Sequence, residues 1–324
     1  MLACTKCGTE FEGNFCPECG TSSQKEKACP LCGVTLGGSV KFCTNCGYFF
    51  GKKVKPKASP QENNDEKQCV VSPLVYSLND DKASYTVAKI ESDCKATEIV
   101  IPKEVNNLPV TAIGRYAFKD CDSLTSVIIP DTVISIGDGA FTGCTRLTDF
   151  TLPKSVSSIG SYAFYHCESL TRLAVPDGVT ELKSCVLGRC SNLTSVVIPN
   201  SVTEIKSCAL KDCKALKSLI IPHGVTSIGS CAFEGCGGLK SITLPSSVTS
   251  IGSGAFGKCK NLTCMIIPNS VTEIKSFAFD GCGNLAHIGI TYRGTKSEWN
   301  EIVKSDDWAG STAYCVHCID GDIS

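Results

Sequence analysis

Eight cysteines near the amino terminus have the spacing of ligands for a metal ion. They form four Cys-x-x-Cys pairs, and each pair is followed directly by glycine: Cys4 and Cys7, Cys16 and Cys19, Cys29 and Cys32, and Cys43 and Cys46. A Cys-x-x-Cys turn can present two thiolates to one ion, and the glycine behind it allows the positive φ that folds the backbone around the sulfurs. Two consecutive pairs can therefore complete one tetrahedral site.

These cysteines predict two structural zinc ions. Each site takes four thiolates, so no position stays open for water or a substrate. The pairs resemble zinc-ribbon knuckles, and their tandem arrangement resembles a double zinc ribbon over residues 1–50, with its parts at 1–20 and 29–47. Disulfides and a redox-active Cys-x-x-Cys are alternatives for the same residues, although a thioredoxin-like motif needs a surrounding βαβ unit that these fifty residues do not supply.

The composition changes after this module. Residues 51–68 are rich in Lys, Pro and polar side chains, which is typical of a flexible linker. The chain of 324 residues has a formal net charge of −1, whereas residues 1–60 carry eight Lys or Arg and four Asp or Glu, a net charge of +4. A basic module on a tether can contact nucleic acid or an acidic protein face, and a solvated linker is the simpler interpretation.

A 23-residue period governs the remainder of the chain. Leucine recurs at this step at Leu124, Leu147, Leu170, Leu193, Leu216, Leu239, Leu262 and Leu285. Cysteine recurs in the same way at Cys121, Cys144, Cys167, Cys190, Cys213, Cys236, Cys259 and Cys282. A spacing kept over eight units predicts an array of stacked repeats, and the period lies within the range of leucine-rich repeats.

The repeat resembles the BspA-like leucine-rich repeats, with their L-x-x-I-x-I-P and I-G-x-x-A-F-x-x-C halves. The resemblance implies a β-rich solenoid, a leucine-rich-repeat superhelix with a parallel β-sheet on its concave side, preceded here by the zinc-ribbon module. We expect an N-terminal β-hairpin cap at 69–95, repeats at 96–290 and a C-terminal cap at 291–324. Within the caps, residues 74–78 and 84–90 predict a hairpin, and Thr295 with Glu298 predicts a helix start.

The positions within one unit predict which side chains face inward. Leu124, Val127 and Ile129 have the strand spacing of inward residues, and Val133 and Ile136 supply a second inward pair. The repeated cysteine is small enough to form a buried column of thiols, with disulfides between neighbouring coils as the alternative. Cys185, Cys208 and Cys231 share a second column with Gly, Tyr and Phe, which indicates partly exposed thiols.

The residues between the inward positions of the strand should face the opposite, concave surface, where they form two columns. The first contains Ser126, Asp149, Arg172, Ser195, Ser218, Ser241 and Cys264. The second contains Ile128, Thr151, Ala174, Val197, Ile220, Thr243 and Ile266. This nearly uncharged surface suits a protein or peptide partner better than a nucleic acid, whose phosphates call for rows of Lys and Arg.

No catalytic constellation is evident in the sequence. His166 next to Cys167 is the nearest arrangement, but Cys167 belongs to a repeated column whose other members lack the histidine. We therefore predict a non-enzymatic protein-protein interaction scaffold. Without a signal peptide or an apolar segment of membrane-spanning length, a cytoplasmic location is expected, and the zinc thiolates also favour a reducing compartment. A surface adhesin exported by an unusual route and a nucleic-acid-linked regulator that uses the zinc ribbons are the alternatives.

Overall fold

The computed structural model describes residues 74–91, 95–311 and 313–323, and the backbone of four two-residue strands nearer the amino terminus. The chain forms two compact units, Met1–Val70 and Val71–Ser324. In the first unit, β1 (Leu2–Ala3) pairs with β2 (Glu10–Phe11), and β3 (Lys27–Ala28) pairs with β4 (Thr35–Leu36), both antiparallel. The predicted linker 51–68 lies outside the described residues.

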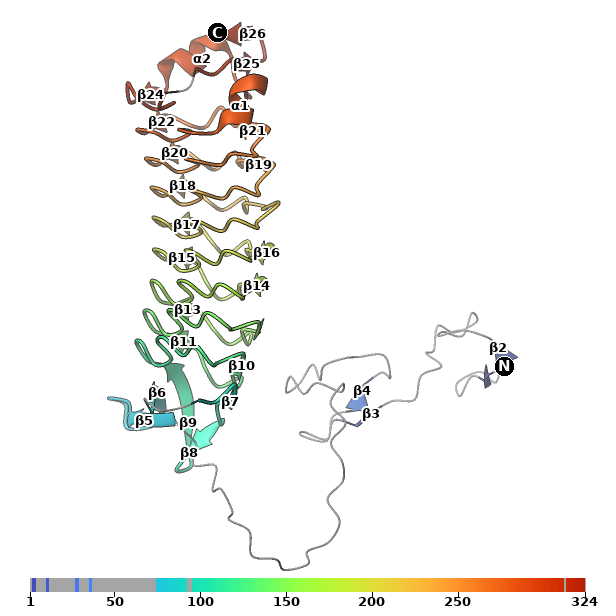
Figure 1. Cartoon of the computed structure of the whole chain (residues 1–324), viewed down its shortest axis with the longest axis vertical. Helices are drawn as coiled ribbons and strands as arrows, with labels where there is room; N and C mark the ends of the chain where they lie inside the picture. The colour runs from blue at the N-terminus through green and yellow to red at the C-terminus, as the bar shows by residue number, and fades with distance from the viewer. Residues whose placement is uncertain are drawn as a thin grey trace, which may run out of the picture. The chain divides into compact units, whose positions relative to one another are not determined.

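The second unit is a stack of coils, as the sequence period predicts (Figure 1). The first strand of each coil lies beside its neighbours in a parallel arrangement that we call the first sheet, and this sheet is interrupted after β12 and after β16. Its strands are β7 (Glu98–Val100), β10 (Ser126–Ile128), β12 (Asp149–Phe150), β14 (Arg172–Ala174), β16 (Ser195–Val197), β19 (Ser241–Thr243), β21 (Cys264–Ile267) and β23 (Ile290–Tyr292).

A second parallel sheet follows the proline of each coil, and the sequence did not predict it as a sheet. Apart from the first, its strands have two residues, such as Ser135–Ile136, and are too short to show an alternating pattern. It contains β9 (Leu108–Ile113), β11 (Ser135–Ile136), β13 (Ser158–Ile159), β15 (Glu181–Leu182), β17 (Glu204–Ile205), β18 (Ser227–Ile228), β20 (Ser250–Ile251), β22 (Glu273–Ile274) and β24 (Val303–Lys304). It is interrupted between β13 and β15.

Both ends of the stack are covered. At the start, β5 (Leu74–Leu78) and β6 (Tyr85–Ile90) form the predicted antiparallel hairpin, and β8 (Glu104–Val105) folds back on β9. At the end lie α1 (Gly283–Ile288), α2 (Lys296–Glu301) and the antiparallel pair β25 (Val316–Cys318) and β26 (Gly321–Ile323). The predicted capping box at the start of α2 is confirmed, since Thr295 and Glu298 bond each other's backbone N–H.

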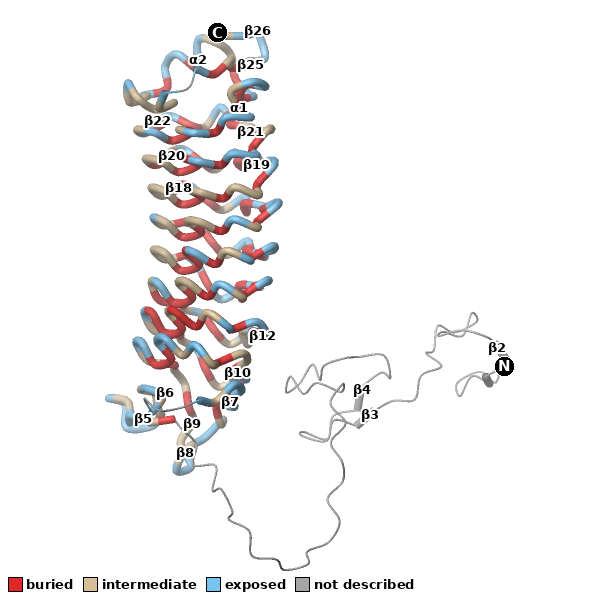
Figure 2. The backbone as a smooth tube through the Cα atoms, viewed as in Figure 1, coloured by how far each residue is buried: buried red, intermediate tan, exposed pale blue. Residues whose placement is uncertain are grey.

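The core runs through the middle of every coil (Figure 2). Its phenylalanines stack from coil to coil, with ring centroids 4.9 Å apart for Phe118 and Phe141 and 5.3 Å apart for Phe233 and Phe256. Leu187 and Leu210 replace the aromatic ring in two central coils. Each coil therefore buries its apolar side chains against the coils before and after it.

Seven of the eight repeated cysteines form a buried thiol ladder, as predicted, whereas Cys121 is half-buried and its thiol bonds within its own coil. Seven thiols each donate a hydrogen bond to a backbone carbonyl of the preceding coil: Cys144, Cys167, Cys190, Cys213, Cys236, Cys259 and Cys282. Every described cysteine is a free thiol. After the last coil the hydroxyl of Tyr314 donates to the Phe279 carbonyl, at 2.5 Å, and so takes the place of the next thiol.

Two residues of each coil adopt left-handed backbone conformations. One column includes Tyr116, Cys185, Cys208 and Phe277, and a second includes Asp120, all with φ between 55° and 58°. At these positions the backbone N–H points to the next coil, where for example the N–H of Cys208 bonds to the Ser230 carbonyl. The two columns therefore link neighbouring coils along the turn side of the stack, which we call the turn face.

Candidate functional site

The two columns predicted from the strand alternation lie on the outside of the first sheet. In the first column Ser126 is half-buried, and Arg172, Ser195, Ser218, Ser241 and Cys264 are exposed. In the second column Ile266 is half-buried, and Ile128, Thr151, Ala174, Val197, Ile220 and Thr243 are exposed. Asp149 belongs to β12, and its side chain lies outside what the structure describes. The role of both columns in binding stays a prediction.

The second column is an exposed apolar stripe in the middle of the stack. Val197 is 59% exposed and Ile220 is 85% exposed, and they occupy equivalent positions in consecutive coils. Val100 lies at the corresponding position of the first coil and is 61% exposed. Large apolar side chains that line up on a surface are typical of a contact site for another protein.

Positive charge accompanies this stripe in the central coils. Lys217 and Lys240 are exposed at the positions directly before Ser218 and Ser241, and Arg172 is exposed at the start of β14. The residues that correspond to Lys217 in the coils before it are threonines, and the hydroxyls of Thr148 and Thr194 donate to carbonyls of the preceding coil. The first sheet thus presents apolar side chains beside a small number of cations.

The second sheet carries paired charges. Lys206 forms ion pairs with Glu204 and, at 3.7 Å, with Glu181 of the preceding coil, and Lys275 lies 3.6 Å from Glu273. The carboxylates and ammonium groups of these pairs therefore neutralise one another along the sheet. Exposed pairs of this kind leave little net charge for a partner.

The turn face holds two shallow cavities that the sequence did not predict. One, of about 240 Å³, is lined by Tyr162, Tyr165, Cys185, Arg189, Cys208 and Lys211. The other, of about 290 Å³, is lined by Cys231, Glu234, Ser253, Gly254, Gly257, Lys258, Ser276, Phe277 and Asp280. Of the thiols predicted to be partly exposed, Cys185 and Cys208 line the first of these cavities and Cys231 lines the second.

Glu234 lies between two lysines on the turn face. Its carboxylate lies 2.6 Å from the Lys211 ammonium and 2.8 Å from that of Lys258. Burial alone would raise the pKa of Glu234, but the hydrogen bonds from the two lysines outweigh it and lower this pKa to about 2. The three charges join three consecutive coils.

The thiols of the ladder are unsuited to nucleophilic chemistry. Burial raises the pKa of Cys190 and of Cys236 to about 12, so both remain protonated at neutral pH. Cys167 bonds to the Phe141 carbonyl, while its neighbour His166 bonds to Glu168, so these two side chains do not form a nucleophile and base pair.

The eight predicted zinc ligands all lie outside the described residues. Within the ranges given above, neither α-helix has the length and apolarity that a membrane crossing requires.

Comparison with known proteins gives a family match and a set of related folds. The family described as "BspA type leucine rich repeat region" matches residues 111–239 and 209–300, in six copies, which together exceed half of the chain. No curated protein matches the chain.

Three of the solved structures that resemble the chain are bacterial leucine-rich repeat proteins. A leucine rich cell surface protein from Faecalibacterium prausnitzii is 26% identical, with a TM-score of 0.38, over 76% of this chain and 98% of that protein. A leucine-rich repeat protein from T. pallidum is 26% identical, with a TM-score of 0.35, over 68% and 79%. One from Bacteroides ovatus is 22% identical, with a TM-score of 0.48, over 69% and 71%.

Proposed function

Since this chain belongs to the BspA-type leucine-rich repeat family, we propose that it is a non-enzymatic interaction protein whose first sheet binds a protein or peptide. The observation that supports this most is the apolar stripe with Val197 and Ile220 exposed on consecutive coils. Burying such side chains against a partner is favourable by about 25 cal/mol per Å² of apolar surface. The stacked coils hold the stripe in place, so little conformational entropy is lost on binding.

The cations beside the stripe suggest the chemistry of the partner. Lys217, Lys240 and Arg172 lie on coils that contribute to the two columns, and no acidic side chain is described in the same central coils of these columns. A partner segment with apolar residues flanked by acidic residues would match both the apolar stripe and the cations. Complementary charge of this kind mainly raises the association rate and the specificity.

We also propose that the eight amino-terminal cysteines hold two structural zinc ions. The paired strands β1 and β2 flank Cys4 and Cys7 in the sequence, and β3 and β4 flank Cys29 and Cys32, which is the arrangement that a zinc knuckle needs. Thiolate ligands and free cysteines both favour a reducing compartment, so we propose a cytoplasmic location.

The test is affinity capture with the full chain and charge-introducing variants. Val197→Asp together with Ile220→Asp places two carboxylates in the stripe, and we expect proteins captured by the wild-type chain to be lost. Ser227→Asp on the second sheet is the matched control and should capture the same proteins as the wild type. Equal capture by all three proteins would contradict the assignment of the first sheet.

Two further measurements separate the alternative functions. Retention on a DNA or RNA column that disappears with salt would favour the regulator that uses the zinc ribbons. Labelling of the protein at the surface of intact cells would favour the adhesin. A partner bound through the first sheet, in contrast, should be lost on Lys217→Glu and Lys240→Glu and should dissociate faster at high ionic strength.

A further inference from the structure

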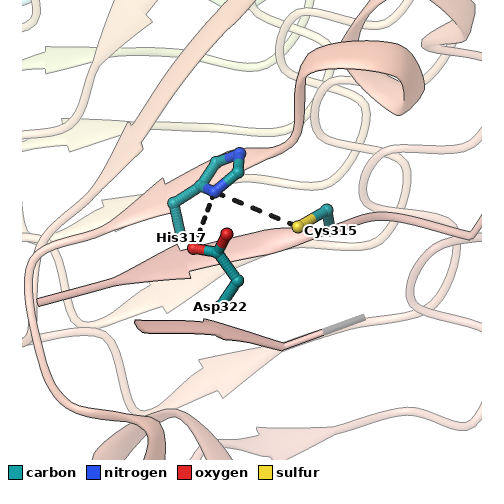
Figure 3. A group of neighbouring side chains, drawn as sticks. All are labelled: Cys315, His317 and Asp322. Carbon is teal, nitrogen blue, oxygen red and sulfur yellow. Dashed lines mark hydrogen bonds and ion pairs between the residues drawn. The ribbon is translucent and has the colours of Figure 1, made fainter. Parts of the chain in front are cut away.

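Three potential metal ligands meet on the C-terminal hairpin (Figure 3). Cys315 and His317 are two residues apart, the second of them in β25, so they lie on the same side of the strand. Asp322 of β26 is the cross-strand partner of His317. The Cys315 Sγ, the His317 Nδ1 and an Asp322 carboxylate oxygen all lie within 4.8 Å of one another.

The imidazole of His317 is held in one orientation. Its Nε2 lies 2.7 Å from the Ile288 carbonyl oxygen, which can only accept a hydrogen bond, so Nε2 carries a proton and donates it. Gly289, with φ of 95°, leaves the space that the ring occupies, because a Cβ there would lie 2.6 Å from Nε2. A backbone carbonyl that fixes the tautomer in this way is the usual outer partner of a metal-binding histidine.

The other ring nitrogen of His317, Nδ1, faces both Cys315 and Asp322. Nδ1 lies 2.9 Å from an Asp322 oxygen and 4.0 Å from the Cys315 Sγ. In a Cys-His-Asp relay the nucleophile and the carboxylate bond to opposite nitrogens of the ring, so that a proton can pass between them. Here both approach the same nitrogen. This convergence is unsuited to nucleophilic catalysis and is the arrangement of ligands around a cation.

We propose that Cys315, His317 and Asp322 form a binding site for a divalent transition-metal ion, with Zn²⁺ as the favoured ion. Sulfur, nitrogen and oxygen donors together suit an ion of borderline softness. On binding, the ion replaces the proton of the Cys315 thiol and any proton on Nδ1, and these protons pass to solvent. A thiolate and a carboxylate then balance the two positive charges, and a fourth position stays open to water.

By its position in the sequence alone, Cys318 would be the nearest candidate for a third ligand. Cys318 follows His317 directly, but residues next to each other in a strand face opposite sides, and the structure brings Asp322 to the cluster instead. The site therefore joins the two strands of the hairpin and, through Ile288, the end of α1. It lies outside the cysteines assigned to the zinc ribbons, so the proposal is independent of them.

The test is zinc binding by the full chain. The purified wild-type protein and the variants Asp322→Asn and His317→Gln are equilibrated with Zn²⁺, and bound zinc per chain is measured by mass spectrometry after gel filtration. We expect each variant to hold one ion fewer than the wild type, or to bind that ion at least ten-fold more weakly. Cys318→Ser, on the other side of the same strand, and His287→Gln, an exposed histidine of α1, are matched controls that should bind as the wild type does.

The difference in bound zinc between the wild type and a variant does not depend on the amino-terminal module, since any ions of that module are present in every sample or in none. Asp322 is exposed, so Asp322→Asn should fold even if the histidine variant does not. Identical zinc content and affinity in the wild type and Asp322→Asn would overturn the proposal.

Discussion

The described thiols of the stacked coils include three kinds of environment and should differ in reactivity. Cys264 is exposed on the first sheet, Cys208 is half-buried on the turn face, where burial raises its pKa to about 11, and the ladder thiols are inaccessible. We expect a maleimide to modify Cys264 first, Cys208 much more slowly and Cys190 only on unfolding. Peptide mass spectrometry after timed labelling measures this order. Rapid native labelling of Cys190 would contradict the buried ladder.

Glu234 should make the free energy of unfolding of the solenoid depend on pH. Its pKa in the folded protein, about 2, lies below its usual value of 4.5, so its contribution is present above pH 4.5 and is lost as the pH falls towards 2. At pH 7 we expect Glu234→Gln to lower the free energy of unfolding by about 1 kcal/mol. This difference should shrink steadily below pH 4.5 in denaturant melts. A difference that is the same at pH 7 and pH 3 would show that the charge contributes nothing.

Single residues also limit how much of the site the sequence could predict. The outward columns follow from strand alternation, so Ser241 and Ile220 could be assigned before the structure. Asp322 could not, because its place opposite His317 depends on the register of a hairpin. Tyr314 has no repeat counterpart, and nothing in its neighbourhood indicates that it bonds to the Phe279 carbonyl.

Among the elements, the left-handed turn of each coil could not be predicted from the sequence. Gly139 and Gly254 in its column were a signal, but Tyr, Cys and Phe occupy the same position elsewhere, and these residues seldom adopt positive φ. The stacking supplies the reason, since the conformation directs the backbone N–H to the next coil. The hydrogen bonds between coils therefore outweigh the preference of Tyr, Cys and Phe for negative φ.

This turn predicts opposite effects for two substitutions of one residue. Cys208 has φ of 58°, where glycine is unstrained and a β-branched side chain is strongly disfavoured. We expect Cys208→Val to lower the free energy of unfolding by about 1–3 kcal/mol, and Cys208→Gly to leave it unchanged or higher. Cys264→Val, in the extended strand β21, is the control and should be neutral. Equal losses for valine and glycine at position 208 would mean that the turn is not left-handed.

The packing between coils can be tested at the ring stack. Phe233 is fully buried, and its ring stacks on that of Phe256. Phe233→Ala should lower the free energy of unfolding by about 3–5 kcal/mol, because it leaves a cavity shared by neighbouring coils. Ser241→Ala on the exposed first sheet should change it by less than about 0.5 kcal/mol. Comparable losses in denaturant melts would show that the inward and outward positions had been exchanged.

For the whole molecule, the two units should respond separately to loss of metal. If the amino-terminal cysteines hold two zinc ions, Cys16→Ser should remove one ion and leave the thermal unfolding of the solenoid unchanged, since the two modules form separate compact units. Metal analysis and a melting curve of the same sample provide both results. A shifted solenoid melting temperature would reveal contact between the units. Zinc near zero, with the eight cysteines oxidised, would contradict the metal assignment.

The direction of the thiol ladder bears on how such a gene can change in length. Each of the seven ladder thiols bonds to a carbonyl of the coil before it, and the last carbonyl of the described ladder, that of Phe279, takes its hydrogen bond from Tyr314 instead. An interior coil has no partner other than its neighbours. Unequal recombination between repeats could therefore add or remove a whole coil without a compensating mutation, provided that the segment with Tyr314 still follows the final one.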